Sequence, residues 1–443
     1  MRADELLLLQ VDTPNGVFVR RIPPAVVLPV GAEHGSAAED ATRAAAAKYG
    51  LPDFVYRPKL QARASGVREI GDALVIAGQY AAAIQVKSRP APTGSERRER
   101  AWLDRQIARA ARQSAGTIRA LRQVATLDLQ NERGRIVAVE ARRREWLAVV
   151  VVDHPGVPDY HPTRSALVLL RRDWEFLFAQ LKSTHAVLAY LGRVRDLSET
   201  VPLGEEPLRY YRLAAADAAA APSPLDPRLA AVGARASSAP VLPRAPAPFG
   251  EIIRWILEDI AAITRPPGTA EEAVLDALEA LDSAAVGMRS ELGEAALRML
   301  EQVVDAPGGG TRWWFRRVLG SGRPQLIIGT ASRHDELIGG AVADYVALRH
   351  QQLAEVLPEQ LNQLTVGVLL TPRTDGMRPW DTSVCATRGD QGFEPDVRAD
   401  LERLWGASGE WAVAGDPTTD TDPFSNAREP RSRDDDDVAS GDK

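Results

Sequence analysis

The chain has 443 residues, and its 45% hydrophobic and 26% charged residues are typical of a globular protein with a substantial core. No apolar run approaches the roughly 18 to 20 residues that a membrane helix needs. Residues 6–9 are too few to form the apolar part of a secretory signal. A single cysteine, Cys385, excludes an intrachain disulfide framework and a Cys-rich zinc site. The composition therefore predicts a cytoplasmic protein with no membrane partner.

Basic residues are concentrated in the first third of the chain. Residues 1–150 hold 24 lysines and arginines against 16 acidic residues, although the whole chain has a net charge of −6. A basic segment on an acidic protein suggests an anionic partner such as nucleic acid. Only five of the 54 basic residues are lysines. Lysine is a compact charge whose pKa can move, whereas arginine is a rigid fork, so each lysine is a candidate for a specific role.

The first half of the chain predicts alternating strands and helices. Strands over residues 6–11 and 16–21 flank an Asn-Gly pair, which is a strong hairpin signal. Ser36 is a suitable N-cap for an alanine-rich helix over residues 37–49. The further predicted elements are strands over 54–64, 68–76 and 80–87, a long helix over 96–124, strands over 135–140 and 146–153, and a helix over 174–191.

Composition divides the chain into successive segments. After a hairpin within residues 1–30 and a domain over 31–204, residues 205–250 are rich in alanine and proline and predict a linker or a loosely packed cover segment. Residues 251–410 predict a second α/β region, and the polar residues 411–443 predict a disordered acidic tail. The elements expected in the second region are helices near 251–263, 270–282 and 290–304, a strand over 325–329, a helix over 336–353 that Ser332 would cap, and a strand over 364–370.

Three polar residues fall near the ends of two neighbouring predicted strands. Side chains alternate across a strand, so Gln85 and Lys87 share one face, and a turn at residues 78–79 brings Asp72 beside them. Oxygen ligands suit a hard cation, and Mg²⁺ (or Mn²⁺) would bind the Asp72 carboxylate, the Gln85 side-chain carbonyl and the backbone carbonyl of Val86. Such a cation can activate water for attack on a phosphodiester, while Lys87 orients or deprotonates that water or holds the phosphate.

This arrangement resembles the PD-(D/E)xK nuclease superfamily, and the Gln85-Val86-Lys87 segment is similar to the glutamine variant of Mrr-like restriction endonucleases. The resemblance implies that Asp72 and Gln85 bind the divalent metal, that Lys87 is catalytic, and that an acid in the preceding helix, Glu39, completes the site. Gly71 stands where the family name has proline.

The resemblance also implies a fold and a function. The fold is a restriction-endonuclease-like αβββαβ core with a mixed sheet, and the function is metal-dependent endonuclease activity on DNA in restriction or another defence against foreign DNA. The resemblance covers about a quarter of the chain and leaves the C-terminal α/β region without a role.

The long helix carries a stripe of basic residues. Four arginines are spaced by 4, 3 and 7 residues, which places them on one side of the helix, where they would bind DNA phosphates. Gln106 and Gln113 are seven residues apart and could face the site. The arginines are Arg105, Arg109, Arg112 and Arg119. Alternatively, the stripe is a solvated helix face paired with Glu99 and Asp104.

Two other functions stay open from the sequence. The chain could be a catalytically inactive nucleic-acid-binding or scaffold protein that keeps the nuclease-like fold. It could also be an interaction protein in which the C-terminal region is the functional part. The sequence leaves assembly into a homo-oligomer open.

Overall fold

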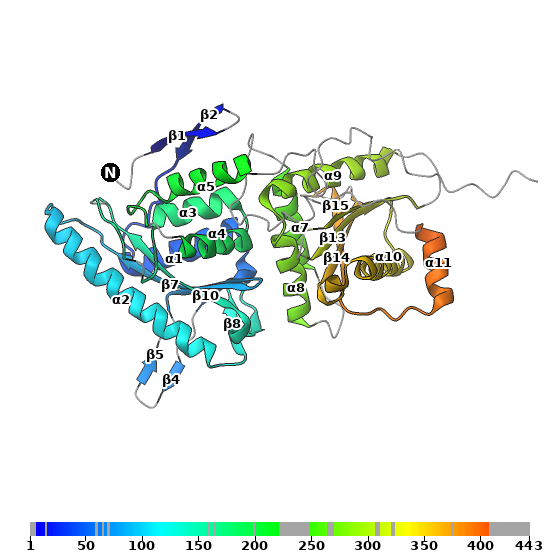
Figure 1. Cartoon of the computed structure of the whole chain (residues 1–443), viewed down its shortest axis with the longest axis horizontal. Helices are drawn as coiled ribbons and strands as arrows, with labels where there is room; N and C mark the ends of the chain where they lie inside the picture. Colours follow the sequence, from blue (N-terminus) through cyan, green and yellow to red (C-terminus); the bar gives the residue numbers. More distant parts are fainter. Residues whose placement is uncertain are drawn as a thin grey trace, which may run out of the picture.

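The structure, a computed structural model, contains two α/β units that lie side by side (Figure 1). The N-terminal unit ends with helix α5 and the C-terminal unit begins with helix α7. The residues that the structure describes are 6–13, 16–57, 61–63, 66–68, 71–156, 159–163, 165–197, 200–220, 249–263, 270–305, 311–319, 324–373, 376 and 378–406. The expected acidic tail and most of the expected linker lie outside these residues.

A seven-stranded mixed sheet forms the centre of the N-terminal unit. The strand order is β11-β10-β7-β6-β3-β8-β9, in which β3, β6 and β7 are antiparallel neighbours and β7, β10 and β11 are parallel. The strands are β3 (Val55–Arg57), β6 (Ala73–Ala77), β7 (Tyr80–Ser88), β8 (Leu127–Asn131), β9 (Ile136–Val139), β10 (Glu145–Asp153) and β11 (Leu167–Leu170). The α/β fold with a mixed sheet is therefore confirmed.

Two hairpins and several short helices complete the framework. The hairpins are β1 (Leu7–Thr13) with β2 (Gly16–Ile22) and β4 (Gln61–Arg63) with β5 (Gly66–Arg68). The short 3-10 helices are η1 (Pro52–Phe54), η2 (Ala141–Arg143) and η3 (Pro358–Asn362).

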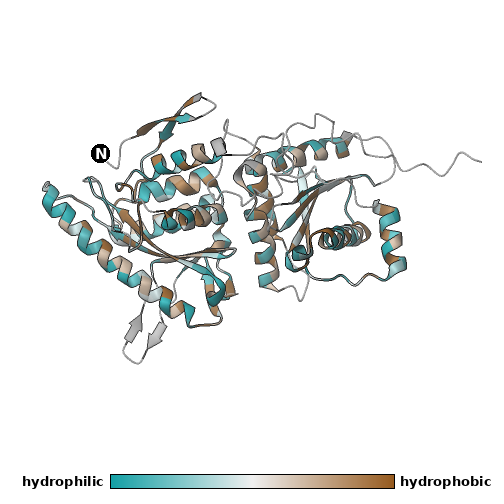
Figure 2. Cartoon of the chain, viewed as in Figure 1, coloured by the Kyte–Doolittle hydropathy of each residue, from teal (hydrophilic) through white to brown (hydrophobic). Residues whose placement is uncertain are grey.

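Helices cover both faces of this sheet (Figure 1). On one face, α1 (His34–Tyr49), α3 (Arg171–Leu181) and α4 (Thr184–Asp196) pack in a core that includes Ile84 and Val86. On the other face, α2 (Glu96–Arg122) packs Leu103 and Ile107 against Val150 and Val152 of β10. The apolar residues of α2 recur every three or four positions, so one side of this long helix is buried and the other is polar (Figure 2).

Several boundaries differ from the sequence-based expectations. Helix α1 is capped by Glu33, whose carboxylate accepts hydrogen bonds from the backbone N–H groups of Gly35 and Ser36, so Ser36 is not the cap. The single helix expected over 174–191 is two helices, because Lys182 has a left-handed backbone (φ 48°) that ends α3. The strands expected over 54–64 and 68–76 are shorter, since β3 and β6 are separated by the β4–β5 hairpin.

The alanine-rich start of the expected linker is a packed helix. Helix α5 (Glu206–Ala220) buries Tyr210 and Tyr211, whose rings contact Phe176 of α3. The linker expectation is therefore wrong for residues 206–220, because two adjacent tyrosines anchor the alanines to the core.

The C-terminal unit contains a four-stranded sheet of order β12-β13-β14-β15, with one parallel pair at its centre. Helices α7, α8 and α9 lie on the side of the sheet nearer the N-terminal unit, and α10 packs on the other side (Figure 1). The elements are α7 (Gly250–Ala262), α8 (Glu271–Asp282), α9 (Val286–Asp305), β12 (Trp313–Leu319), β13 (Gln325–Ala331), α10 (Glu336–Val356), β14 (Thr365–Pro372), β15 (Trp380–Thr387) and α11 (Pro395–Trp405). Strands β12 and β15 and helix α11 are not among the elements expected from the sequence, and the cap of α10 is Asp335 rather than Ser332.

The C-terminal unit docks at the end of the N-terminal sheet where the turn between β6 and β7 lies; we call this the turn end. Arg144, which precedes β10, donates to the carbonyl of Gly78 in this turn and lies 3.4 Å from the Glu279 carboxylate of α8. At the same end, one Arg133 nitrogen lies 2.7 Å from Asp53 and 2.8 Å from Glu258 of α7.

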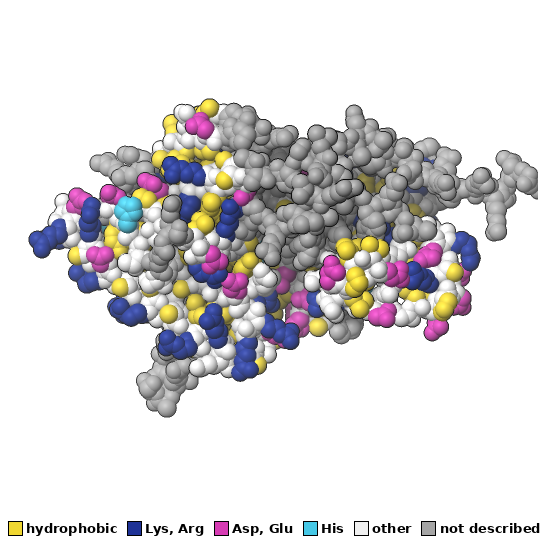
Figure 3. Space-filling model, viewed as in Figure 1, with side chains coloured by type: hydrophobic (Ala, Val, Ile, Leu, Met, Phe, Trp, Pro, Cys, Tyr) yellow, Lys and Arg dark blue, Asp and Glu magenta, His cyan; other side chains and the backbone are white. Residues whose placement is uncertain are grey.

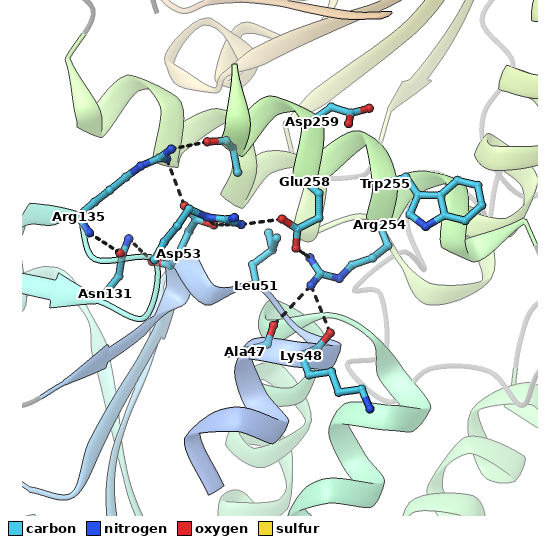
Figure 4. Close-up of polar contacts among 12 residues, drawn as sticks. Ala47, Lys48, Leu51, Asp53, Asn131, Arg135, Arg254, Trp255, Glu258 and Asp259 are labelled. Carbon is cyan, nitrogen blue, oxygen red and sulfur yellow. Dashed lines mark hydrogen bonds and ion pairs between the residues drawn. The ribbon is translucent and has the colours of Figure 1, made fainter. Parts of the chain in front are cut away.

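Backbone carbonyls add to this interface, as Figure 4 shows. Arg135 donates to the carbonyl of Ala261 at 2.5 Å, and Arg254 of α7 donates to the carbonyls of Ala47 and Lys48 at the end of α1 at 3.4 and 3.2 Å. These charged contacts join the two units at the turn end, and one apolar core cluster also contains residues of both units, such as Leu51 and Leu257. None of the described helices is both long enough and apolar enough to span a bilayer.

Candidate active site

Asp72, Gln85 and Lys87 come together where β7 ends. The backbone N–H of Val86 donates to Asp72 Oδ2 at 2.6 Å, and Lys87 Nζ lies 3.8 Å from the same oxygen. Lys87 Nζ also donates to Gln85 Oε1 at 3.4 Å. A carboxylate, an amide oxygen and an ammonium thus share one cluster, which we call the carboxyl-end cluster.

Strand alternation and one glycine produce this geometry. Ile84 and Val86 belong to the core on the α1 side, whereas Ala81 and Ala83 belong to the core beneath α2, so Gln85 and Lys87 project on the α2 side. Register pairs Ala73 with Ile84, and the Asp72 N–H donates to the carbonyl of Ile84 at 3.0 Å. Asp72 therefore lies directly opposite Gln85.

Gly71 explains why proline is absent before Asp72. Its φ of +127° lies in a region that L residues rarely adopt and that proline cannot reach. A Cβ at this position would be 3.3 Å from Gln85 Nε2. The glycine therefore leaves room for the amide nitrogen of Gln85, while the amide oxygen faces Lys87.

The charge state of Asp72 depends on its surroundings. Burial raises the pKa of Asp72, and the hydrogen bond from Val86 and the charges of Lys87 and Arg43 act in the opposite direction. Arg43 of α1 also donates to the Asp72 carbonyl at 2.9 Å. The Val86 N–H and the Lys87 ammonium therefore lie against the buried carboxyl group, and Arg43 holds the backbone of the same residue.

Glu39 is placed differently from the three clustered residues. It lies on α1 one turn before Arg43 and is half-buried. Helix α1 covers the Ile84 and Val86 face of the sheet, whereas Gln85 and Lys87 project on the opposite face. The structure therefore groups Asp72, Gln85 and Lys87, and it places the helix that carries Glu39 across the sheet from the side chains of Gln85 and Lys87.

The donor set fits a hard divalent cation. The Asp72 carboxylate, the Gln85 side-chain oxygen and the backbone carbonyl of Val86 are oxygen ligands, and Mg²⁺ is often held by one or two carboxylates together with water and substrate phosphate. The oxygen rather than the nitrogen of Gln85 faces the cluster, which suits this role. Within the described part of the chain, no three Asp, Glu, His or Cys side chains are grouped to hold a metal ion, so Asp72 would be the central ligand.

The arginine stripe of α2 is exposed, and the structure shows no ion pair for its four members among the residues it describes. Gln113 is exposed and Gln106 is half-buried. Figure 3 shows basic side chains along the edge of the N-terminal unit where α2 lies. The stripe consists of Arg105, Arg109, Arg112 and Arg119.

The acids that could have neutralised this stripe have other partners. Glu99 pairs with Arg89 and His154, and Asp104 accepts a hydrogen bond from the hydroxyl of Tyr160 at 2.9 Å. The pairing of the stripe with Glu99 and Asp104 is therefore wrong, whereas the exposure of the four arginines agrees with a solvated helix face. Four cations on one helix face, for which the described residues supply no ion pair, are also suited to a polyanion.

Two arginines near the cluster, Arg43 and Arg89, were not among the candidate site residues expected from the sequence. Arg89 could have been found, because strand alternation places it on the same face as Lys87. The contact between Glu99 and His154 joins residues 55 positions apart and had no signal in the sequence.

Comparisons with protein-family models, with curated proteins and with solved structures found no match to this chain.

Proposed function

We propose that this chain is a metal-dependent endonuclease that hydrolyses DNA phosphodiester bonds. The observation that carries the proposal is the carboxyl-end cluster, in which Lys87 Nζ lies 3.8 Å from an Asp72 oxygen and 3.4 Å from the Gln85 amide oxygen. The order α1, β3, β6, β7, α2, β10, with the four strands adjacent in one sheet, supports a restriction-endonuclease-like core. Restriction or another defence against foreign DNA is the role that such an activity would serve.

Each residue of the cluster has a defined task in this proposal. The Val86 N–H fixes one oxygen of Asp72, so the carboxylate is oriented before a ligand arrives. A divalent cation held by Asp72 and Gln85 would lower the pKa of water and offset negative charge on the phosphate. Lys87 places a positive charge where negative charge develops on the phosphate oxygens during attack, and it can orient the attacking water.

The arginine stripe of α2 would position the substrate. Exposed arginines on one helix face contact phosphates without reading sequence, so they would set the path of the DNA rather than its target site. The stripe lies on the exposed face of α2, and the buried face of the same helix covers the Gln85 and Lys87 side of the sheet.

A plasmid-cleavage assay tests the proposal. Purified protein should nick or linearise supercoiled plasmid with Mg²⁺ or Mn²⁺ and should be inactive with EDTA. Asp72→Asn should remove this activity, whereas Asp128→Asn, at an exposed position of β8, should not. Activity that survives EDTA, or that is equal in wild type and Asp72→Asn, would contradict the proposal.

The second candidate function is nucleic-acid binding without catalysis. It is favoured by the composition of the cluster, because Asp72 is the one carboxylate among its three members. In that case the purified protein would bind duplex DNA with strong salt dependence and would cut it with neither metal.

A further inference from the structure

Arg89 extends the line of functional side chains beyond Lys87. The backbone of Arg89 continues the pairing with β10, since its N–H donates to the carbonyl of Asp153 at 2.9 Å. Two residues of extended strand separate the Cα atoms of Lys87 and Arg89 by about 6.6 Å, and alternation places both side chains on the α2 side. Neighbouring phosphates of a nucleic-acid strand have a similar separation.

The guanidinium of Arg89 is locked in one orientation. Its Nε lies 2.6 Å from Glu99 Oε2, and its Nη2 donates to Glu99 Oε1 at 2.9 Å. The guanidinium also lies over the ring of Trp102, 5.2 Å from the ring centroid. Two parallel contacts and a stacking partner fix a planar group more firmly than a single ion pair would.

Glu99 is held in turn by groups that keep it charged. It accepts hydrogen bonds from the backbone N–H of Thr93 at 2.8 Å and from the Thr93 hydroxyl at 2.6 Å. His154 Nε2 lies 2.8 Å from Glu99 Oε2, and the Gly156 N–H donates to the other ring nitrogen, so Nε2 carries the proton. Burial acts to raise the pKa of Glu99, but these hydrogen bonds and Arg89 outweigh it and lower the pKa to about 2.

One edge of the guanidinium is left for a ligand. The side chain of Arg89 is 17% exposed, and among the described residues the structure gives its Nη1 no hydrogen-bond partner. An ion pair that served only the core would not need a partly exposed cation at the strand end beside Lys87. A rigid arginine with a free edge is the geometry that recognises phosphate.

We propose that Arg89 is a phosphate-binding residue of the nuclease site, which contacts the backbone phosphate next to the one that is cleaved. Glu99 is its positioning residue, and Trp102 and His154 complete the support. This inference rests on the proposed function and adds to it a second phosphate subsite, from which the bound strand continues toward the arginine stripe of α2.

Binding measured without cleavage tests this assignment. A fluorescent duplex would be titrated with full-length protein in EDTA at several salt concentrations, so that affinity and its salt slope are read separately from chemistry. Arg89→Ala should weaken binding about tenfold and reduce the magnitude of the slope by about 1. Arg89→Lys keeps a positive charge beside Glu99, so the salt slope of duplex binding should stay at the wild-type value. Affinity for the duplex should still fall in part, because lysine lacks the planar fork of arginine. Arg403→Ala, on the exposed side of α11, is the matched control and should change neither quantity.

The Glu99→Gln variant tests whether Glu99 orients the Arg89 guanidinium or only stabilises the fold. With Mg²⁺, this variant should raise the KM for plasmid and change kcat less, because the arginine remains but its orientation loosens. Wild-type affinity and slope in both Arg89 variants would overturn the assignment of Arg89 and leave the nuclease proposal intact. Absence of duplex binding by the wild type would overturn the proposed function and, with it, this subsite.

Discussion

The two ends of the N-terminal sheet both carry buried charges, but these charges have different partners. At the turn end, Arg144 and Arg133 contact carboxylates of the C-terminal helices and backbone carbonyls of the turn. At the carboxyl end of β7, Lys87 and Arg89 contact acids of their own unit. The turn end is an interface between units, whereas the other end has the properties of a site.

This contrast shows that buried charge alone does not identify function. Glu279 at the turn end has a pKa raised by burial to about 7, a larger change than the structure gives for Asp72. Asp173, in the core of the N-terminal unit, also has a pKa raised by burial to about 7, so a perturbed pKa does not single out a functional site. What separates the two ends is the partner of each cation, because the turn-end arginines contact the C-terminal unit, whereas Lys87 and Arg89 contact acids of their own unit.

The largest difference between the two ends should be in catalysis. Lys87→Ala should lower Mg²⁺-dependent plasmid cleavage at least about 100-fold, because it removes the charge nearest the reacting phosphate. Thermal unfolding should be nearly unchanged. Lys48→Ala, at an exposed position of α1, should retain full activity. Equal cleavage by Lys87→Ala and wild type would remove the carboxyl-end cluster from consideration.

Changes at the turn end should instead affect stability. Arg144→Ala leaves the Gly78 carbonyl without this donor and Glu279 without its nearby cation. We expect a loss of about 2 kcal/mol in the free energy of unfolding, measured in urea. Arg143→Ala, whose side chain is 80% exposed, is the neighbouring control. Cleavage per folded molecule should stay at the wild-type level, and a selective loss of cleavage would show that the two ends are coupled.

The arginine stripe should contribute to DNA affinity rather than to chemistry. The double variant Arg105→Ala/Arg109→Ala should weaken duplex binding about tenfold at 150 mM salt and reduce the magnitude of the salt slope by about 2. Cleavage at saturating DNA should change little. A double change of Arg298 and Arg403 to alanine, in the C-terminal unit, removes the same charge as a control. An unchanged slope in the stripe variant would mean that the DNA takes another path.

The smallest expected effect is a pH dependence at the turn end. Burial raises the pKa of Glu279 from 4.5 to about 7, so the fold favours its protonated form. The stability that this preference contributes is present below about pH 4.5 and is lost as the pH rises through 7. Glu279→Gln should therefore flatten the fall in unfolding free energy between pH 5.5 and 8 by about 1 kcal/mol.

The matched control for this pH dependence is Glu272→Gln, at an exposed position of the same helix, which should leave the pH profile as in wild type. Identical profiles for wild type and Glu279→Gln would show that Glu279 is ionised throughout this range in the folded protein.

The sequence predicted the parts of the site that depend on local rules. Alternation placed Gln85 and Lys87 on one face, and the Gly78-Gln79 turn fixed the register that brings Asp72 beside them. It could not predict the role of Gly71, because the need for a positive φ follows from the space that the Gln85 amide occupies. Nor could the sequence predict that α5 packs on the core, because a run of alanines occurs both in linkers and in helices. The contacts of Tyr210 and Tyr211 with Phe176 are what hold this helix in place.

The sequence by itself determined the elements around the site, because strand alternation, turn residues and helix periodicity act between residues close in the chain. Tertiary structure alone decided the partners of the charges. Glu99 could have paired with arginines of its own helix, yet packing of α2 on the sheet brings it to Arg89 and His154. Ion pairs select the partner that packing brings within reach, and among the described residues that selection leaves the four arginines of the stripe without an ion pair.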